Sequence, residues 1–348
     1  MTNYRFLQLD VFTDHPFGGN PVAVFPEAEG LSTEDMLKIA REMNLSETVF
    51  VLKPEMVKAD SESAGGGKAS PQKSSADGNP TQSESQTVLR RLRIFTPTRE
   101  IPFAGHPIVG TWNALAREGV VPLPDAGTGW TRILHEIGIG VLPVDIEFDN
   151  GQPIQVVMTQ GKPALEAIID DSHEQADIAR ALGLAREDLD ESLPIQVIST
   201  GLPFLAVPIR ALADLRNCLV NSSLLTEIYT NLGATGCAPF TRETIEVGTA
   251  LAHLRMFAPG DNIPEDPATG SAAGALGAYL VHYGASGVAP VDGVFKFMIE
   301  QGDFINRSSR MNLEVKGVTG AVEQVRVGGP SVLVIRGELS SLEESQVQ

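Results

Sequence analysis

One short motif occurs twice in this chain, and its two copies place different ionisable side chains at the same point. The first copy spans residues 93–111, with RIFTP followed by GHPIVGT, and the second spans 255–271, with RMFAP followed by EDPATGS. When a two-residue gap is allowed, the prolines and glycines match and His106 falls opposite Asp266. The chain is therefore expected to fold as two similar halves.

Each copy has the pattern of a strand, a turn, a polar cap residue, a proline at the first helical position and a helix. The helices are predicted at 107–118 and 267–283. Such helix ends leave backbone N–H groups free, so two of them facing each other across a pseudo-two-fold axis would attract anions. His106 and Asp266 are also ordinary cap residues, and a purely structural capping role is the alternative for each of them.

Composition and charge narrow the possible partners. The 348 residues suffice for two domains, and the 42% hydrophobic content is typical of a soluble globular protein. The sequence has no long apolar run and no secretory signal, so we expect a cytoplasmic protein without a membrane partner. The net charge of −18 disfavours nucleic acid. A small anionic substrate would need a local attraction, which the helix N-termini can supply.

The sequence offers no pattern for a metal or a cofactor. Cys218 and Cys237 lie outside both repeats without metal-ligand spacing, and we interpret them as buried or idle thiols. The histidines form no HxH or HExxH pair, and residues 138–140 lack the third glycine of a dinucleotide fingerprint. We therefore expect no metal and no cofactor.

Glu47 stands out by its position in a predicted strand at 47–52. It has the same parity as Val49 and Val51, so its carboxylate begins an apolar face. Because a solvated charge is costly there, Glu47 is a candidate acid/base group.

The remaining pattern predicts an α+β fold with two sheets, each wrapping a central helix. The N-terminal domain is expected at 1–135 plus about 336–348, and the C-terminal domain at 136–335. Within the first domain, residues 54–86 contain no aromatic side chain and are predicted to be a disordered insertion in a hairpin loop, with a regulatory role as the less favoured alternative. The small residues of helix 267–283 indicate a buried helix that another helix approaches closely.

The other helices and strands are predicted from the spacing of apolar residues and from the capping and turn-forming residues between them. Ser32 is predicted to cap a helix that ends near Met43, with Asn44 as a left-handed cap. Further helices are predicted near 174–182 and 222–231. Strands are predicted at 4–13, 20–26, 88–96, 140–148, 154–160, 244–257, 294–300, 310–315, 322–327 and 331–337.

Four segments together resemble the PhzF family, the phenazine-biosynthesis isomerase-like proteins. These segments are GGNPVAV at 18–24, NLSET at 44–48, FTPTREIPFAGHP at 95–107 and EDPATGSAAG at 265–274. The segments occur in the right order, and the resemblance covers nearly the whole chain apart from the insertion at 54–86. The resemblance implies a diaminopimelate epimerase-like fold, with two pseudo-symmetric β-barrel-like domains, the site between them, and a C-terminal strand that returns to the first domain.

The resemblance also implies an activity and a set of site residues. The family's best-understood member isomerises trans-2,3-dihydro-3-hydroxyanthranilate without a cofactor, by proton shuttling. Its acid/base glutamate matches Glu47, and its histidine and aspartate match His106 and Asp266. Its substrate-contacting positions match Ser46, Gly105, Gly270 and Ser271, with Thr269 adjacent.

We therefore expect a cofactor-independent isomerase that acts on a small carboxylate-bearing metabolite. One alternative is an epimerase or racemase that uses Glu47 opposite Asp266. Another is a non-catalytic metabolite- or protein-binding member of the family. A racemase with two thiols is disfavoured because neither repeat contains a cysteine. The choice between a homodimer and a monomer is open.

Overall fold

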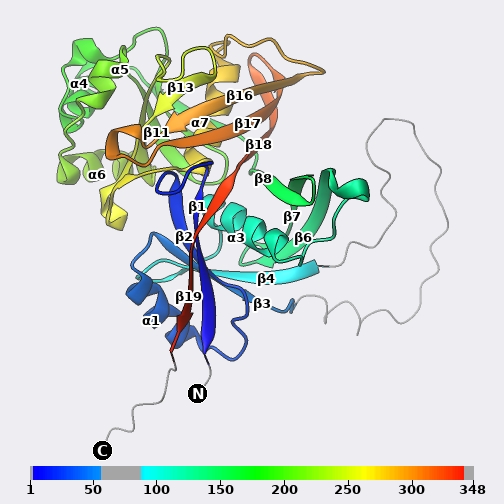
Figure 1. Ribbon diagram of the computed structural model, residues 1–348. Helices are drawn as coiled ribbons and strands as arrows, with labels where there is room; N and C mark the ends of the chain where they lie inside the picture. The colour runs from blue at the N-terminus through cyan, green and yellow to red at the C-terminus, as the bar shows by residue number, and fades with distance from the viewer. Residues whose placement is uncertain (1–2, 56–87, 341–348) are drawn as a thin grey trace, which may run out of the picture.

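The computed structural model describes residues 3–55 and 88–340. The predicted insertion at 54–86 lies outside this part of the chain, apart from its first two residues. Figure 1 shows two lobes, each with a sheet that curves around one long helix. These helices are α3 (Gly105–Arg117) in the first lobe and α7 (Gly270–His282) in the second.

The first lobe contains eight of the longer strands. They are β1 (Tyr4–Val11), β2 (Asn20–Phe25), β3 (Glu47–Leu52), β4 (Val88–Phe95), β6 (Gly129–Ile137), β7 (Gly140–Asp149), β8 (Gln152–Thr159) and β19 (Ser331–Leu339), with the short β5 (Glu100–Ile101) beside β4. The helix α1 (Thr33–Met43) packs on β3 and β4. As predicted, Ser32 caps this helix by accepting the N–H of Asp35, and Asn44 ends it with a left-handed backbone.

The second lobe repeats this plan. Its strands are β9 (Ala164–Ile169), β10 (Ile195–Ser199), β11 (Pro203–Pro208), β12 (Gly236–Thr241), β13 (Ala250–Leu254), β14 (Met256–Ala258), β15 (Ile263–Asp266), β16 (Val294–Gln301), β17 (Ser309–Val318) and β18 (Ala321–Gly329). Its smaller helices are α4 (Ser172–Ala181), α5 (Leu212–Arg216) and α6 (Ser222–Asn231). Short 3-10 turns lie at Asp125–Gly127, Arg186–Asp188, Pro259–Asp261 and Asp303–Ile305.

The strand pairings confirm the duplication. In the first lobe β1–β2 is antiparallel, β2–β3 parallel, β3–β4 antiparallel and β4–β6 parallel, followed by the antiparallel β6–β7 and β7–β8. In the second lobe the pairs β10–β11, β11–β12, β12–β13, β13–β16, β16–β17 and β17–β18 follow the same order of directions. The two halves therefore share one topology.

Two kinds of pairing extend this symmetry to the junction between the lobes. The strand β9 adds to β10 as β19 adds to β1, and both pairings are antiparallel. The equivalent strands β8 and β18 pair with each other, with Thr159 opposite Arg326 and Val156 opposite Gly329. Because β7 and β8 continue the sheet around α3, we propose that the first lobe extends to residue 159 and resumes at 331, instead of ending at 135 and resuming at 336.

The predicted long strand at 244–257 is wrong in its first half. Regular pairing begins only at Ala250, and β13 and β14 are separate strands. The preceding segment turns instead, because the buried Glu300 carboxylate accepts the backbone N–H groups of Ile245 and Glu246. Hydrogen bonds to the Glu300 side chain therefore replace the strand-to-strand hydrogen bonds that a sheet would provide there.

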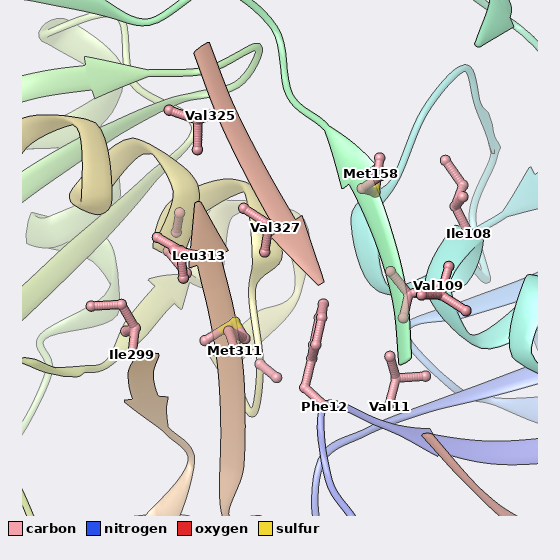
Figure 2. Close-up of a cluster of buried hydrophobic side chains, with 14 of the residues drawn as sticks. Val11, Phe12, Ile108, Val109, Met158, Ile299, Met311, Leu313, Val325 and Val327 are labelled. Atoms are coloured by element: carbon pink, nitrogen blue, oxygen red, sulfur yellow. The ribbon is translucent and has the colours of Figure 1, made fainter. Parts of the chain in front are cut away.

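Apolar side chains of both lobes form one continuous core. Figure 2 shows Phe12, at the end of β1, between Met311 and Val327 of the second lobe and the side chains around Val109 and Met158 of the first. Burial of so much apolar surface at the junction holds the lobes against each other.

The helix α7 is buried from Gly270 to Val281, as its composition predicts. The predicted approach of another helix occurs at the N-terminus of α7, where Gly105 of α3 lies beside Gly270, and further along α7 the close neighbours are strands. A β-carbon at Gly277 would lie 2.4 Å from Leu313 of β17, and one at Gly274 would lie 2.9 Å from Val327 of β18. Glycine allows the helix axis to come this close to the sheet that surrounds it.

Candidate active site

The structure brings Glu47, His106 and Asp266 together at the junction of the lobes. Glu47 is the first residue of β3, His106 is the second residue of α3, and Asp266 is the last residue of β15. The Nε2 atom of His106 lies 3.3 Å from Oε2 of Glu47. The second lobe contributes the Asp266 carboxylate to the same centre, since this group accepts a hydrogen bond at 2.9 Å from Asn20 of β2, the strand that pairs with β3 at Glu47.

Neither ionisable residue of the repeated motif is a helix cap, so this part of the sequence prediction is wrong. The helix α3 begins two residues before Pro107, with Ala104 as its N-cap, and α7 begins at Gly270, with Thr269 as its N-cap. Neither N-cap side chain accepts a hydrogen bond from the helix. The side chains of His106 and Asp266 therefore do not cap these helices.

Glu47 is a buried carboxylic acid. Its side chain is only 13% exposed, and Oε2 has no hydrogen-bond partner among the described residues. Burial raises the pKa of Glu47 from 4.5 to about 7, against a hydrogen bond with Ser46. The Ser46 hydroxyl also lies 3.4 Å from Oδ1 of Asn20, and its single hydrogen serves one of these acceptors at a time.

His106 is a neutral imidazole at neutral pH. Burial lowers its pKa to about 4, although the Asp266 carboxylate and a backbone hydrogen bond with Pro21 oppose this shift. Proline has no N–H, so its carbonyl accepts a ring N–H of His106. Nε2 has no hydrogen-bond partner in the described part of the chain, and we therefore assign the N–H to Nδ1. The Nε2 lone pair then faces the Glu47 carboxyl group, which can present a proton to it.

Asp266 shares the buried environment and has more polar partners. Its Oδ1 accepts a hydrogen bond from Nδ2 of Asn20 at 2.9 Å, and its Oδ2 accepts one from the Thr269 hydroxyl. Burial raises the pKa of Asp266 to about 6, and the charge of Glu47 adds to this effect, whereas His106, Thr269 and Asn20 favour the ionised form. Both carboxyl groups thus have pKa values close to physiological pH.

The N-termini of the two central helices meet at this centre, as the sequence predicted. A β-carbon at Gly105 would lie 3.9 Å from Cα of Gly270 and 3.9 Å from the backbone nitrogen of Ser271. Side chains larger than hydrogen would fill this space. The first-turn N–H groups of both helices therefore point into one region, with the positive ends of both helix dipoles.

The other predicted site residues also lie here. Ser46 precedes Glu47, Thr269 donates to Asp266, and Ser271 is buried in the first turn of α7. The carbonyl of Ser271 accepts a hydrogen bond from the Thr200 hydroxyl at 3.3 Å.

Sequence reasoning missed two buried polar residues of this centre, Asn20 and Gln301. Asn20 joins the lobes, since it donates to Asp266 and to the carbonyl of Ala268, both at 2.9 Å. Gln301 contacts Asp266 and Thr269 from the end of β16. Asn20 lies in the segment GGNPVAV at 18–24, which resembles the PhzF family and is echoed by GLPFLAV at 201–207, but neither signal gives the contacts of Asn20.

Three further observations concern possible metal sites, membrane-spanning helices and a hollow elsewhere in the structure. Within residues 3–55 and 88–340, no group of three or more His, Cys, Asp or Glu side chains could hold a metal ion. No helix in the described part of the chain has the length and apolar character to cross a membrane. A hollow of about 540 Å³ lies in the second lobe, and its lining, which includes Ile168, Arg186 and Tyr283, contains none of the site residues.

Comparison with known proteins agrees with this geometry. The family model described as "Phenazine biosynthesis-like protein" matches residues 9–337. An uncharacterized isomerase of Clostridium acetobutylicum is 33% identical over 97% of this chain and 98% of its own length. The trans-2,3-dihydro-3-hydroxyanthranilate isomerase of Pseudomonas aeruginosa is 31% identical over 96% of this chain and 98% of its own length.

Solved structures show the same similarity. A PhzF family protein of Bacillus anthracis matches 97% of this chain and 99% of its own, with 27% identity and a TM-score of 0.78. A predicted epimerase of Pseudomonas aeruginosa has the same coverage, 30% identity and a TM-score of 0.70. A probable proline racemase of Agrobacterium radiobacter, at 12% identity and a TM-score of 0.56 over 99% of this chain and 94% of its own, shares the fold alone.

The fold and the site thus define an isomerase built from two pseudo-symmetric α+β lobes of the diaminopimelate epimerase-like kind. The chain belongs to the PhzF family of phenazine biosynthesis-like proteins.

Proposed function

We propose that the protein is a cofactor-independent isomerase that moves a proton between two carbons of a small carboxylate-bearing metabolite. The observation that carries this proposal is the buried Glu47 carboxyl group with Oε2 3.3 Å from Nε2 of His106. A group whose pKa is about 7 gains and loses a proton with similar ease at neutral pH. Glu47 is thus suited to act as a base and an acid within one catalytic cycle.

In the proposed reaction, the Glu47 carboxylate removes a proton from an activated substrate carbon. The electrons of the broken C–H bond move into the adjacent conjugated system, and the protonated Glu47 then delivers the same proton to a second carbon. No atom is gained or lost overall. The neutral His106 lies beside this carboxyl group with a free lone pair and is placed to bind a polar hydrogen of the substrate or of Glu47.

The helix N-termini suit the charge of such a substrate. Their N–H groups at Gly105, Gly270 and Ser271 lie together and are not capped by side chains. A substrate carboxylate bound there would be held by oriented backbone donors in spite of the acidic chain. We therefore propose a small anion as the partner of the site.

The test uses trans-2,3-dihydro-3-hydroxyanthranilate, the compound in the name of the Pseudomonas aeruginosa relative. In deuterated water, the protein should convert it and leave deuterium at the newly protonated carbon whenever Glu47 exchanges with solvent during the cycle. Glu47→Gln keeps the shape of the side chain but cannot shuttle a proton, and should lose at least about a thousandfold in kcat. Comparable kcat in this variant would contradict the assignment of Glu47.

If this compound does not react, it is not the substrate, and the isomerase proposal is then tested with other acids. A panel of small carboxylic acids would then be screened for solvent deuterium incorporation, with Glu47→Gln as the matched control. The absence of Glu47-dependent exchange with every acid that raises the melting temperature would contradict the isomerase proposal.

A second candidate activity is epimerisation at a single carbon. It is favoured by the raised pKa of Asp266, about 6, because a second carboxyl group that titrates near neutrality could return a proton from the opposite side. Chiral analysis distinguishes the two activities. An epimerase produces a mixture of stereoisomers from one enantiomer, and an allylic isomerase changes the position of the double bond.

A further inference from the structure

The connection between β15 and α7, from Asp266 to Thr269, is held by side chains from other elements. Each of its first three carbonyl groups lies within hydrogen-bond distance of a donor on one of them. The pairs are Asp266 with Nε2 of Gln301 at 2.7 Å, Pro267 with the hydroxyl of Ser309 at 3.0 Å, and Ala268 with Nδ2 of Asn20 at 2.9 Å. The single hydrogen of the Ser309 hydroxyl serves either Pro267 or the carbonyl of Arg307, which lies 2.8 Å away. A connection with its backbone groups so fully bound has one conformation.

Gln301 makes the largest number of these contacts. The residue is fully buried at the end of β16. Its Oε1 accepts the backbone N–H of Thr269 at 3.0 Å, while its Nε2 donates to the carbonyl of Asp266. A backbone N–H can only donate and a carbonyl can only accept, so these two contacts fix which end of the amide is oxygen and which is nitrogen.

That orientation determines where the Thr269 hydroxyl points. The Nε2 group of Gln301 lies 3.1 Å from Oγ1 of Thr269 and can only donate to it. The hydroxyl has a single hydrogen, which is therefore left for Oδ2 of Asp266. Gln301, Thr269 and the Asp266 carboxylate form a chain of hydrogen bonds in one direction.

We propose that Gln301 is a positioning residue that turns the Thr269 hydroxyl toward Asp266 and so keeps this carboxyl group in its ionised form. The catalytic meaning of this role rests on the proposed function. The titratable groups that face Asp266 are His106 and Glu47, and Asn20 donates to its other oxygen. Gln301 contacts Asp266 directly only at its backbone carbonyl, and it reaches the carboxyl group through the Thr269 hydroxyl.

The test measures the titration of Asp266 directly, by NMR of protein labelled with carbon-13 at aspartate carboxyl groups. The resonance is assigned with Asp266→Asn. Gln301→Met removes the donor and the acceptor of the amide, and should raise the apparent pKa of Asp266 by about one unit, a tenfold change in proton affinity. Ser309→Ala is the matched control, because Ser309 binds the same connection without contacting Asp266's side chain, and should leave the titration unchanged.

A double-variant cycle tests the route through Thr269. Thr269→Val should raise the pKa of Asp266 by itself, and Gln301→Met should then add nothing further. Additive shifts would show that Gln301 does not act through the hydroxyl and would overturn the proposal. If Gln301→Met does not fold, Gln301→Leu replaces it, since leucine also has no N–H to offer the hydroxyl and adds no charge that would itself shift the Asp266 titration.

The NMR titration needs no substrate, so it separates this proposal from the proposed function. An unchanged Asp266 titration in a folded Gln301 variant overturns the positioning role whatever the enzyme does. If the wild-type protein catalyses no exchange, the proposed function fails while the titration result stands. If the proposed function and the positioning role are both correct, the acidic limb of the pH–rate profile should shift to higher pH in Gln301→Met, together with the Asp266 titration. It should not shift in Ser309→Ala.

Discussion

Replacing Glu47 should stabilise the folded protein at alkaline pH, although we expect it to abolish turnover. Burial raises the pKa of Glu47 from 4.5 to about 7. Between these two values the folded state holds a proton that the unfolded state has lost, so the free energy of unfolding falls as pH rises. Each unit corresponds to about 1.4 kcal/mol, and the carboxylate therefore costs the folded protein about 3 kcal/mol at pH 8.

Glu47→Gln removes this cost, because a neutral amide does not ionise. At pH 5 most of the Glu47 carboxyl groups are protonated in the folded state, and the cost in the wild type is only about 1 kcal/mol. The difference in the free energy of unfolding between Glu47→Gln and wild type should thus grow by roughly 2–3 kcal/mol from pH 5 to pH 8. The comparison across pH cancels any constant effect of the amide on packing.

Urea denaturation at a series of pH values measures this difference. Glu300→Gln is the control, because its effect on stability should depend on pH in the opposite direction. Although burial raises the pKa of Glu300, hydrogen bonds from His253 and two backbone N–H groups keep it below its usual range. The stabilising contribution of Glu300 is present above its unfolded pKa, so that variant should lose more stability at pH 8 than at low pH. A Glu47→Gln difference that is constant or shrinks from pH 5 to pH 8 would refute the reasoning.

Three further outcomes follow from the structure. The pKa of the buried His135 is lowered to about 4, so the contribution of His135 to the free energy of unfolding should be lost as pH drops below about 6.5, and urea melts should show His135→Phe gaining stability relative to the wild type over that range. Gly277→Val should lower the free energy of unfolding by roughly 1–3 kcal/mol or more, because even its β-carbon would collide with Leu313, and a melt unchanged from wild type would contradict the packing. Sulfate should raise the melting temperature of the wild type but not of Gly270→Val, which blocks the approach to the backbone at Ser271, and an equal rise in both would place the anion elsewhere.

The overall architecture could be predicted because the duplicated motif repeats local signals. Each half contains the same order of strand, turn and small-residue helix, and the apolar periods that define these elements depend only on neighbouring residues. The position of Glu47 on an apolar strand face was accessible for the same reason, since strand parity alone brings its carboxyl group toward the core.

The helix starts could not be read from the prolines. The first three N–H groups of any helix lack intrahelical partners, so a proline is tolerated at the third position as well as the first. Pro107 occupies that third position in α3. Pro267 lies before its helix altogether, because its connection is held by side chains from distant strands.

Asn20 and Gln301 were missed because their partners are remote in sequence. Asn20 is 246 residues from Asp266, and Gln301 is 35 residues from it. Hydrogen bonds of this kind have no period and no spacing that a single sequence can show. The contacts of Asn20 follow from the docking of the two lobes, and those of Gln301 follow from the packing of β16 beside the start of α7 within the second lobe.

The pairing of β19 with β1 has a consequence for synthesis of the chain. The edge of β1, from Tyr4 to Val11, is completed by a strand that begins at Ser331. During synthesis, β1 emerges from the ribosome before the second lobe, and its last neighbour emerges only after that lobe has been made. The first lobe therefore has one open sheet edge throughout synthesis of the second lobe, and a cell must shield this edge from pairing with other nascent chains.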